Sequence, residues 1–286
     1  MARNTERLGV QQNKNVDGPP APMVQDNSGG FSFVVPTEFV ELPSQGKYYP
    51  EGHPLHEQET IEIKQMTAKE EDILTSRSLL KKGVVLDRLI RNIIVDKRID
   101  PDSLLVGDRN AIIIATRVSG YGSDYVTQVT CPSCRTKQEY SFSLNSATVY
   151  EGADVSKLDI EAHGNGTFTV QLPKTKLDVT FKLLTGGDEK SFIANMEAER
   201  KRKHKAEKNV TRQIASMVVG INGDNSTQAI NYLAENIPSA DSRHLRSAYR
   251  LAAPNIDLTQ HYECEECSYE DEMGVPITAD FFWPDR

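Results

Sequence analysis

The sequence has no hydrophobic run that approaches the 18 or so residues of a membrane-spanning helix. Residues 1–15 (MARNTERLGVQQNKN) are polar and lack the apolar stretch of a secretory signal, so we expect a soluble protein of intracellular origin. The short signatures of nucleotide-binding P-loops, serine hydrolases, zinc peptidases and dinucleotide-binding folds are also missing. We therefore expect no enzymatic activity.

Positive charge is in deficit along the chain. Lys and Arg number 33 against 41 Asp and Glu, which gives a formal net charge of −8. Because nucleic-acid binding rests largely on neutralising phosphates, this balance disfavours broad nucleic-acid binding. The basic run 200–208 is flanked and interrupted by glutamates at helical spacing, as in a solvated helix face; the alternative is a contact with an acidic partner.

Cysteine is scarce, and its placement is informative. The four cysteines form two Cys-x-x-Cys pairs, Cys131 with Cys134 and Cys264 with Cys267. Each pair stands between two alternating, strand-like segments, which predicts a zinc knuckle at the tip of a hairpin. Two facing knuckles would make a closed tetrahedral zinc-ribbon site of four thiolates, in which one Zn²⁺ has a structural role.

The sequence also allows three other states of these cysteines: a disulfide within each pair, a redox dithiol, or ordinary reduced thiols. A redox Cys-x-x-Cys should open a helix, whereas strand-like residues follow both pairs here. His261 could replace a ligand, but its place in an alternating strand favours a neighbouring role.

The sequence also contains an apparent internal duplication. Residues 108–144 align with 241–277 without a gap, and both cysteine pairs fall in register. Upstream, the blocks around Val40 and Ile61 recur in the same order around Val170 and Val179. With 286 residues, of which 38% are hydrophobic, the chain is long enough for two such units. We expect an N-terminal arm at 1–35, a first repeat at 36–150 and a second repeat at 151–286.

Each repeat is predicted to be an α+β unit: strand, strand, helices, strand, Cys-x-x-Cys, strand. A capping box of Thr67 and Glu70 predicts a helix that runs to about residue 82. Asp100-Pro101 predicts the start of a helix to about 119, and Asp188 predicts a helix cap in the second repeat. A further helix is expected at 84–95, where one helical face carries an apolar stripe of Val85, Leu86, Leu89, Ile90 and Ile93. The remaining expected helices are 209–219, 226–235 and 240–252, and the expected strands are 60–66, 124–130, 138–144, 167–172, 177–184, 257–263 and 271–277.

The N-terminal arm, residues 1–35, has few large apolar side chains before Phe31. Such a segment cannot offset its ordering entropy by burying its own surface. We therefore expect it to be disordered alone and to become ordered against partner subunits. Phe31, Phe33, Val34 and Val35 lie where the arm joins the fold, and their alternation favours strand addition to an exposed sheet edge.

Several segments together resemble a known family. They are Phe39–Pro50 (FVELPSQGKYYP), Met66–Thr75 (MTAKEEDILT), the two cysteine pairs and Phe281–Pro284 (FFWP). From about residue 36 onward the chain is similar to the baseplate proteins of T-even-like phages, the hub-associated family of contractile tails. The resemblance implies a non-enzymatic structural or assembly role, with other baseplate and tail proteins as partners in a multi-subunit assembly.

The leading hypothesis is a duplicated α+β protein, joined by one structural Zn²⁺, that is assembled in the host cytoplasm into the tail baseplate of the virion. The alternative is a nucleic-acid-binding zinc-ribbon protein that uses the basic run with Arg243, Arg246 and Arg250, which share one helical face. A metalloenzyme would need a vacant ligand position, which a site of four thiolates lacks.

Overall fold

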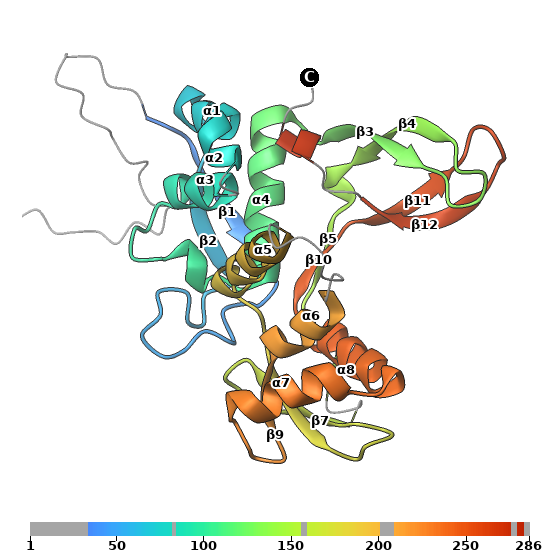
Figure 1. Ribbon diagram of the computed structural model, residues 1–286. Helices are drawn as coiled ribbons and strands as arrows, with labels where there is room; N and C mark the ends of the chain where they lie inside the picture. The colour runs from blue at the N-terminus through green and yellow to red at the C-terminus, as the bar shows by residue number, and fades with distance from the viewer. Residues whose placement is uncertain (1–33, 82–83, 156–158, 201–208, 276–278, 283–286) are drawn as a thin grey trace, which may run out of the picture. The chain divides into compact units, whose positions relative to one another are not determined.

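The computed structural model describes residues 34–81, 84–155, 159–200, 209–275 and 279–282 (Figure 1). Residues from Thr37 onward form one compact unit, and nearly all of the predicted arm lies outside the described residues. Helices and small sheets alternate within this unit, which confirms the α+β class. In the ranges described, no helix is long and apolar enough to cross a membrane.

The first half opens with an antiparallel hairpin of β1 (Thr37–Glu41) and β2 (Thr60–Lys64), in which Val40 faces Ile61. Ile61 and Ile63 are buried while their neighbours are more exposed, as the alternation predicts. Three helices follow: α1 (Ala68–Thr75), α2 (Arg77–Lys81) and α3 (Val85–Ile93). The predicted apolar stripe of α3 is buried through Val85, Leu89, Ile90 and Ile93.

The capping box at the start of α1 is confirmed. The Glu70 carboxylate accepts from the Thr67 amide and from Lys64, each at 3.0 Å. The predicted continuous helix to residue 82 is wrong, because α1 ends at Thr75 and Ser76 is extended. The Thr75 hydroxyl donates to the Glu71 carbonyl at 3.0 Å, and hydroxyl groups that bond to backbone in this way compete with helix continuation.

The long helix of the first half, α4 (Val106–Tyr121), starts later than predicted. Asp100 caps only a short 3-10 turn, η1 (Pro101–Ser103), and the next two residues are extended. The reason is tertiary pairing: Leu105 forms a β-bridge with Thr185, and the Val106 amide donates to the Leu184 carbonyl at 3.0 Å. Leu104 and Leu105 are buried by this arrangement.

The first half closes with the hairpin of β3 (Asp124–Thr130) and β4 (Lys137–Ser143), followed by η2 (Leu144–Ser146) and the short strand β5 (Thr148–Tyr150). Tyr125, Thr127 and Val129 are buried and alternate with exposed neighbours on β3. This hairpin presents the first cysteine pair at its tip.

The second half is built on a four-stranded antiparallel sheet. Its strands, in spatial order, are β6 (Ile160–Ala162), β7 (Thr167–Gln171), β8 (Asp178–Lys182) and β9 (Val218–Ile221). In β7 and β8, Val170 faces Val179. The helix predicted to residue 219 is wrong at its end, because Val218 and its β-branched neighbours pair with β8 as a strand. The helices of this half are α5 (Gly186–Arg200), α6 (Asn209–Met217), α7 (Thr227–Asn236) and α8 (Ser239–Ala252).

Asp188 has a different role from the predicted one. Helix α5 begins at Gly186, so Asp188 lies inside the first turn and is not its N-cap. Its carboxylate accepts from the Thr185 amide at 3.0 Å and from Lys182 at 2.7 Å. These contacts repeat those of Glu70 with Thr67 and Lys64 at the start of α1.

Two segments cross between the halves. After α8, strand β10 (Asn255–Asp257) pairs with β5 of the first half. The chain then forms the hairpin of β11 (Thr259–Glu263) and β12 (Glu270–Gly274) and the short helix η4 (Ala279–Phe282). The fully buried Arg117 of α4 donates from Nε to the Phe281 carbonyl of η4 at 2.6 Å. Both halves therefore share one hydrophobic core.

A buried aspartate near the start of α4 and of α8 holds a loop that joins two paired strands, β1 with β2 in the first half and β7 with β8 in the second. Asp108 accepts from the Ser44 amide (2.9 Å), the Ser44 hydroxyl (2.6 Å) and the Tyr49 hydroxyl (2.7 Å). Asp241 accepts from the Lys174 amide (2.8 Å) and from the amide and hydroxyl of Thr175 (2.9 and 2.8 Å). Both carboxylates are fully buried.

Candidate metal centre

The two cysteine pairs stand at the tips of matching hairpins (Figure 1). In the first, the Cys131 amide donates to the Thr136 carbonyl at 2.9 Å, and the Arg135 amide donates to the Cys131 carbonyl at 3.0 Å. In the second, the amides of Cys264 and Ser268 make the corresponding bonds, both at 2.9 Å. Each turn therefore closes around its first cysteine in the same way.

A left-handed residue follows each pair. Arg135 has φ 64° and Ser268 has φ 51°. Each allows the chain to reverse immediately after the second cysteine and re-enter the hairpin. The two turns share the same local geometry although their sequences, CPSC and CEEC, differ between the cysteines.

Side chains of the strands hold the two hairpins together. Gln260 of β11 accepts from the Ser143 amide at 3.0 Å and donates to the Ser143 carbonyl at 2.9 Å. The Tyr140 hydroxyl donates to the His261 carbonyl at 3.1 Å, and the Tyr140 and Tyr262 rings lie 5.1 Å apart. His261 thus contacts the first hairpin through its backbone, and its side chain does not belong to the cysteine cluster.

All four sulfurs meet where the hairpin tips face each other. They lie within 4.8 Å of one another, with Cys131 and Cys267 Sγ 3.8 Å apart and Cys134 and Cys264 Sγ 3.7 Å apart. A tetrahedral ion with metal–sulfur bonds of about 2.3 Å requires sulfur separations of about 3.8 Å. A disulfide would bring two sulfurs to about 2.05 Å, and all four cysteines are free thiols. The cluster therefore fits one metal ion.

The cluster is buried on one side only. Cys131 and Cys264 are buried, whereas Cys134 and Cys267 are exposed. Neither Cys-x-x-Cys opens a helix, since a turn and a strand follow each pair. The arrangement lacks the strand-to-helix junction of a redox dithiol, and four thiolates would fill a tetrahedral coordination sphere.

The environment does not favour four thiolates without a cation. Hydrogen bonds from the Thr136 side chain and amide lower the pKa of Cys134 to about 6. Cys267 receives a bond from the Tyr269 amide, but burial and the neighbouring sulfurs raise its pKa to about 11. A divalent ion would offset this mutual repulsion, because metal ligation deprotonates thiols.

Tyr262 provides an independent observation that fits a metal. Its hydroxyl is buried and has no hydrogen-bond partner among the described residues. Burial raises its pKa, and the adjacent Cys264 and Cys131 sulfurs raise it further. Thiolate sulfurs bound to a metal would accept from this hydroxyl, the kind of outer contact that metal ligands usually have. No feature of the sequence alone singles out this tyrosine.

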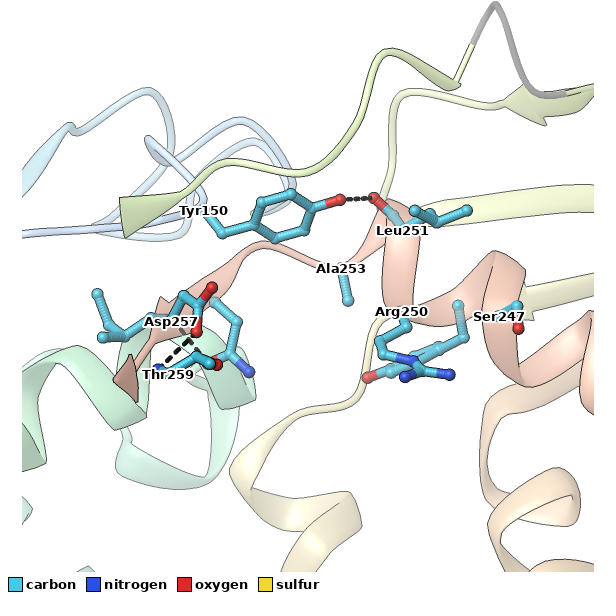
Figure 2. A pocket seen from close by; sticks show the side chains of 10 residues that line it. Tyr150, Ser247, Arg250, Leu251, Ala253, Asp257 and Thr259 are labelled. Carbon is cyan, nitrogen blue, oxygen red and sulfur yellow. Dashed lines mark hydrogen bonds between the residues drawn. The ribbon is translucent and has the colours of Figure 1, made fainter. Parts of the chain in front are cut away.

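A separate cavity of about 640 Å³ lies at the junction of α8, β5 and β10 (Figure 2). Figure 2 shows the Tyr150 hydroxyl donating to the Leu251 carbonyl (2.8 Å) and the Asp257 carboxylate accepting from the Thr259 amide (2.8 Å). The Thr259 hydrogen bonds lower the pKa of Asp257, which leaves it an ordinary carboxylate.

The arginines proposed for nucleic-acid contacts lie on α8. Arg243 and Arg250 are exposed, whereas Arg246 donates to the Ser242 carbonyl at 3.3 Å. Most of the basic run 200–208 lies outside the described residues. Among the described residues, this face of α8 therefore exposes two cations, Arg243 and Arg250.

Comparison with known proteins gives one finding. A family model described as T4 bacteriophage base plate protein matches residues 35–283. No curated protein and no solved structure matches the chain. The matched range spans both hairpins with all four cysteines, and it leaves out residues 1–34.

Proposed function

The chain belongs to the T4 bacteriophage base plate protein family, and from this membership we propose that it is a structural or assembly component of a contractile tail baseplate. It would act in the virion tail through contacts with neighbouring baseplate and tail proteins, and not through catalysis. The observation that carries the proposal is the family match over nearly the whole chain. A cluster of four cysteines, which would leave a bound metal no vacant ligand position, supports it.

We propose that the cluster holds one structural Zn²⁺ through Cys131, Cys134, Cys264 and Cys267. The sulfur separations of 3.7 and 3.8 Å support a tetrahedral thiolate site, which suits zinc or iron. The hairpin-tip knuckles favour zinc, since zinc ribbons are built in this way. The ion would join two hairpins that come from different halves of the chain.

We further propose that the two halves arose by duplication, with repeats at 36–150 and 151–286. Three sets of contacts support this. The register of β1 with β2 matches that of β7 with β8, and the register of β3 with β4 matches that of β11 with β12. Glu70 and Asp188 hold equivalent helix starts, and Asp108 and Asp241 hold equivalent loops. The turns after both cysteine pairs contain a left-handed residue at the same position.

The N-terminal arm, residues 1–35, would dock onto neighbouring subunits. Its composition offers few side chains for self-burial, so its order would come from partners. The proposal concerns residues that lie mostly outside the described ranges.

The function is tested in phage tails. Phage carrying wild-type protein, a Cys131→Ser/Cys264→Ser variant, or a deletion of residues 2–30 are compared by mass spectrometry of purified tails. We expect the wild-type protein to be present in the baseplate or to be required for its assembly. Both variants should be depleted from purified tails or should assemble poorly. Normal tails in the complete absence of the protein would refute the baseplate role.

The metal is tested on the purified chain. Elemental analysis should give one zinc per chain, and the double serine variant should carry none. Iron in its place would refute the choice of metal, and a metal-free, fully folded wild type would refute the site.

A further inference from the structure

Among the described residues, one edge of the β1–β2 hairpin is open, although the corresponding edge in the second half is covered. In the sheet of the second half, β7 pairs with β8 on one side and with β6 on the other. Strand β1 corresponds to β7 by register, and in the described residues β1 pairs only with β2. An unpaired strand edge presents free N–H and C=O groups that can bind another strand.

A groove of about 310 Å³ runs beside this open edge. Its floor is the apolar stripe of α4 at helical spacing, Ala111, Ile114, Ala115 and Val118. Its walls are residues 38–41 of β1 on one side and Val149 and Ile256 on the other. Two large apolar side chains at this groove are exposed, Phe39 at 56% and Val149 at 37%. We name this feature the edge groove.

The edge groove also contains an unsatisfied polar atom. One carboxylate oxygen of Glu38 is buried without a hydrogen-bond partner in the part of the chain that the structure describes. Buried polar atoms are nearly always bonded, so a lone acceptor at a strand edge indicates a missing donor. The backbone N–H groups of an added strand are such donors.

The chain's own preceding residues are poorly suited to fill the edge groove as β6 fills its counterpart. The turn from β6 to β7 needs positive φ at Gly164 (74°) and Gly166 (75°). The same positions before β1 are Val34 and Pro36. A β-branched residue strongly disfavours positive φ, and proline is fixed near −65°. Val34 and Pro36 therefore disfavour a turn of the β6–β7 kind before β1.

We propose that residues 31–35 of a second copy of this chain pair with the free edge of β1 in the edge groove, and that the exchange is reciprocal. The segment FSFVV alternates aromatic and β-branched residues with a serine, as a strand with one apolar face requires. Because it leads directly into β1, two copies placed antiparallel bring each segment alongside the other's β1. A reciprocal pairing of this kind closes about a twofold axis.

This inference rests on the proposed function in one respect: it names the surface to which the N-terminal docking arm binds. Its test uses the full-length, metal-loaded chain in solution and is therefore separate from assembly into tails. Failure to dimerise would leave the baseplate role untouched, and failure to enter tails would leave the dimer intact.

The experiment compares Phe39→Asp with the matched control Val126→Asp, which alters an exposed residue (54%) on β3 away from the edge groove. Analytical ultracentrifugation over a concentration series should show a dimer for wild type and for Val126→Asp. Phe39→Asp, and Phe33→Asp on the donor segment, should each raise the dissociation constant about tenfold or more.

Identity of the occupant is read from crosslinks. A photoreactive amino acid replaces Phe39 in a mixture of ¹⁵N-labelled and unlabelled chains, and crosslinked peptides are weighed. Pairs that join position 39 of one isotope to residues 31–35 of the other support the exchange. Crosslinks confined to one isotope, a monomeric wild type, or equal loss of dimer in Val126→Asp would each overturn it.

Discussion

Asp108 and Asp241 occupy corresponding places at the starts of α4 and α8, yet their pKa values shift in opposite directions. Burial raises the pKa of Asp108, and the donors from Ser44 and Tyr49 do not fully compensate. Burial also opposes ionisation of Asp241, but the amides of Lys174 and Thr175 outweigh it and the pKa is lowered. Two amides and one hydroxyl, with His244 nearby, thus favour the charged form of Asp241 more than one amide and two hydroxyls favour that of Asp108.

The two aspartates should therefore respond to pH with opposite trends. Asp241→Asn should lower the free energy of unfolding by about 2 kcal/mol at neutral pH, because an amide accepts less strongly than a carboxylate. This cost should shrink as pH falls below about 4 and through the lowered native pKa. The stabilising contribution of Asp108 is complete below its unfolded pKa and is lost as pH rises through its raised native pKa. Asp108→Asn should therefore cost less towards neutral pH.

Urea unfolding of both variants and wild type between pH 3 and 8, chosen to bracket an unfolded pKa of about 4, measures these trends. Variants that lose stability in parallel across this range would contradict the assigned directions.

Tyr262 is the residue that we expect to tune the metal affinity of the cysteine cluster through an outer hydrogen bond. Its buried hydroxyl is unpartnered, within the described residues, beside the Cys264 and Cys131 sulfurs. We expect Tyr262→Phe to weaken zinc binding about tenfold to a hundredfold, because an outer hydrogen bond to a ligand is lost. The matched control is Tyr140→Phe, which removes a hydroxyl bonded to the His261 carbonyl in the same pair of hairpins. Competition with a chromophoric chelator gives both affinities; equal affinities would remove Tyr262 from the site.

At the scale of elements, the close approach of α4 to the second half depends on glycine. A side chain at Gly107 would overlap the Pro254 carbonyl oxygen, whereas one at Gly120 of the same helix would meet only the flexible end of Met66. We expect Gly107→Ala to cost about 3 kcal/mol of unfolding free energy through overpacking. Gly120→Ala should change stability by about 1 kcal/mol at most, since alanine favours a helix. Similar unfolding midpoints for both variants would contradict this account of the contact.

The sequence was most informative where local patterns agree with tertiary contacts. Paired cysteines, alternating strands and the stripe of α3 predicted the hairpins, the cluster and that helix. It failed where distant pairing decides the local structure. Leu104 and Leu105 are held extended beside Thr185, and Val218 pairs with Phe181, so helices predicted there start late or end early. The short strands β5, β6 and β10 have too few residues to show a period.

At the scale of the whole molecule, the contacts that join the halves include the cysteine cluster, the pairing of β5 with β10, the bridge between Leu105 and Thr185, and the bond from Arg117 to Phe281. Of these contacts, only the cysteine cluster would depend on a bound metal. Chelation should therefore loosen the hairpins without unfolding the chain.

Hydrogen exchange measured before and after chelation tests this division. We expect the protection of 124–143 and 259–274 to fall, while β7 and β8 stay protected because their sheet lies within one half. Reloading zinc should restore the original pattern. Uniform loss of protection across all strands would show that the metal holds the whole fold together.

The separation of the cysteines along the chain also has a consequence for synthesis. Cys134 leaves the ribosome 130 residues before Cys264, its partner in the cluster. At about 5–20 residues per second, the first pair waits roughly 7 to 26 s for the second. During this interval its thiols are accessible to oxidants and to competing ions. A chain that terminates prematurely before Cys264 cannot complete the cluster, so a metal bound there would distinguish finished chains from truncated ones before assembly.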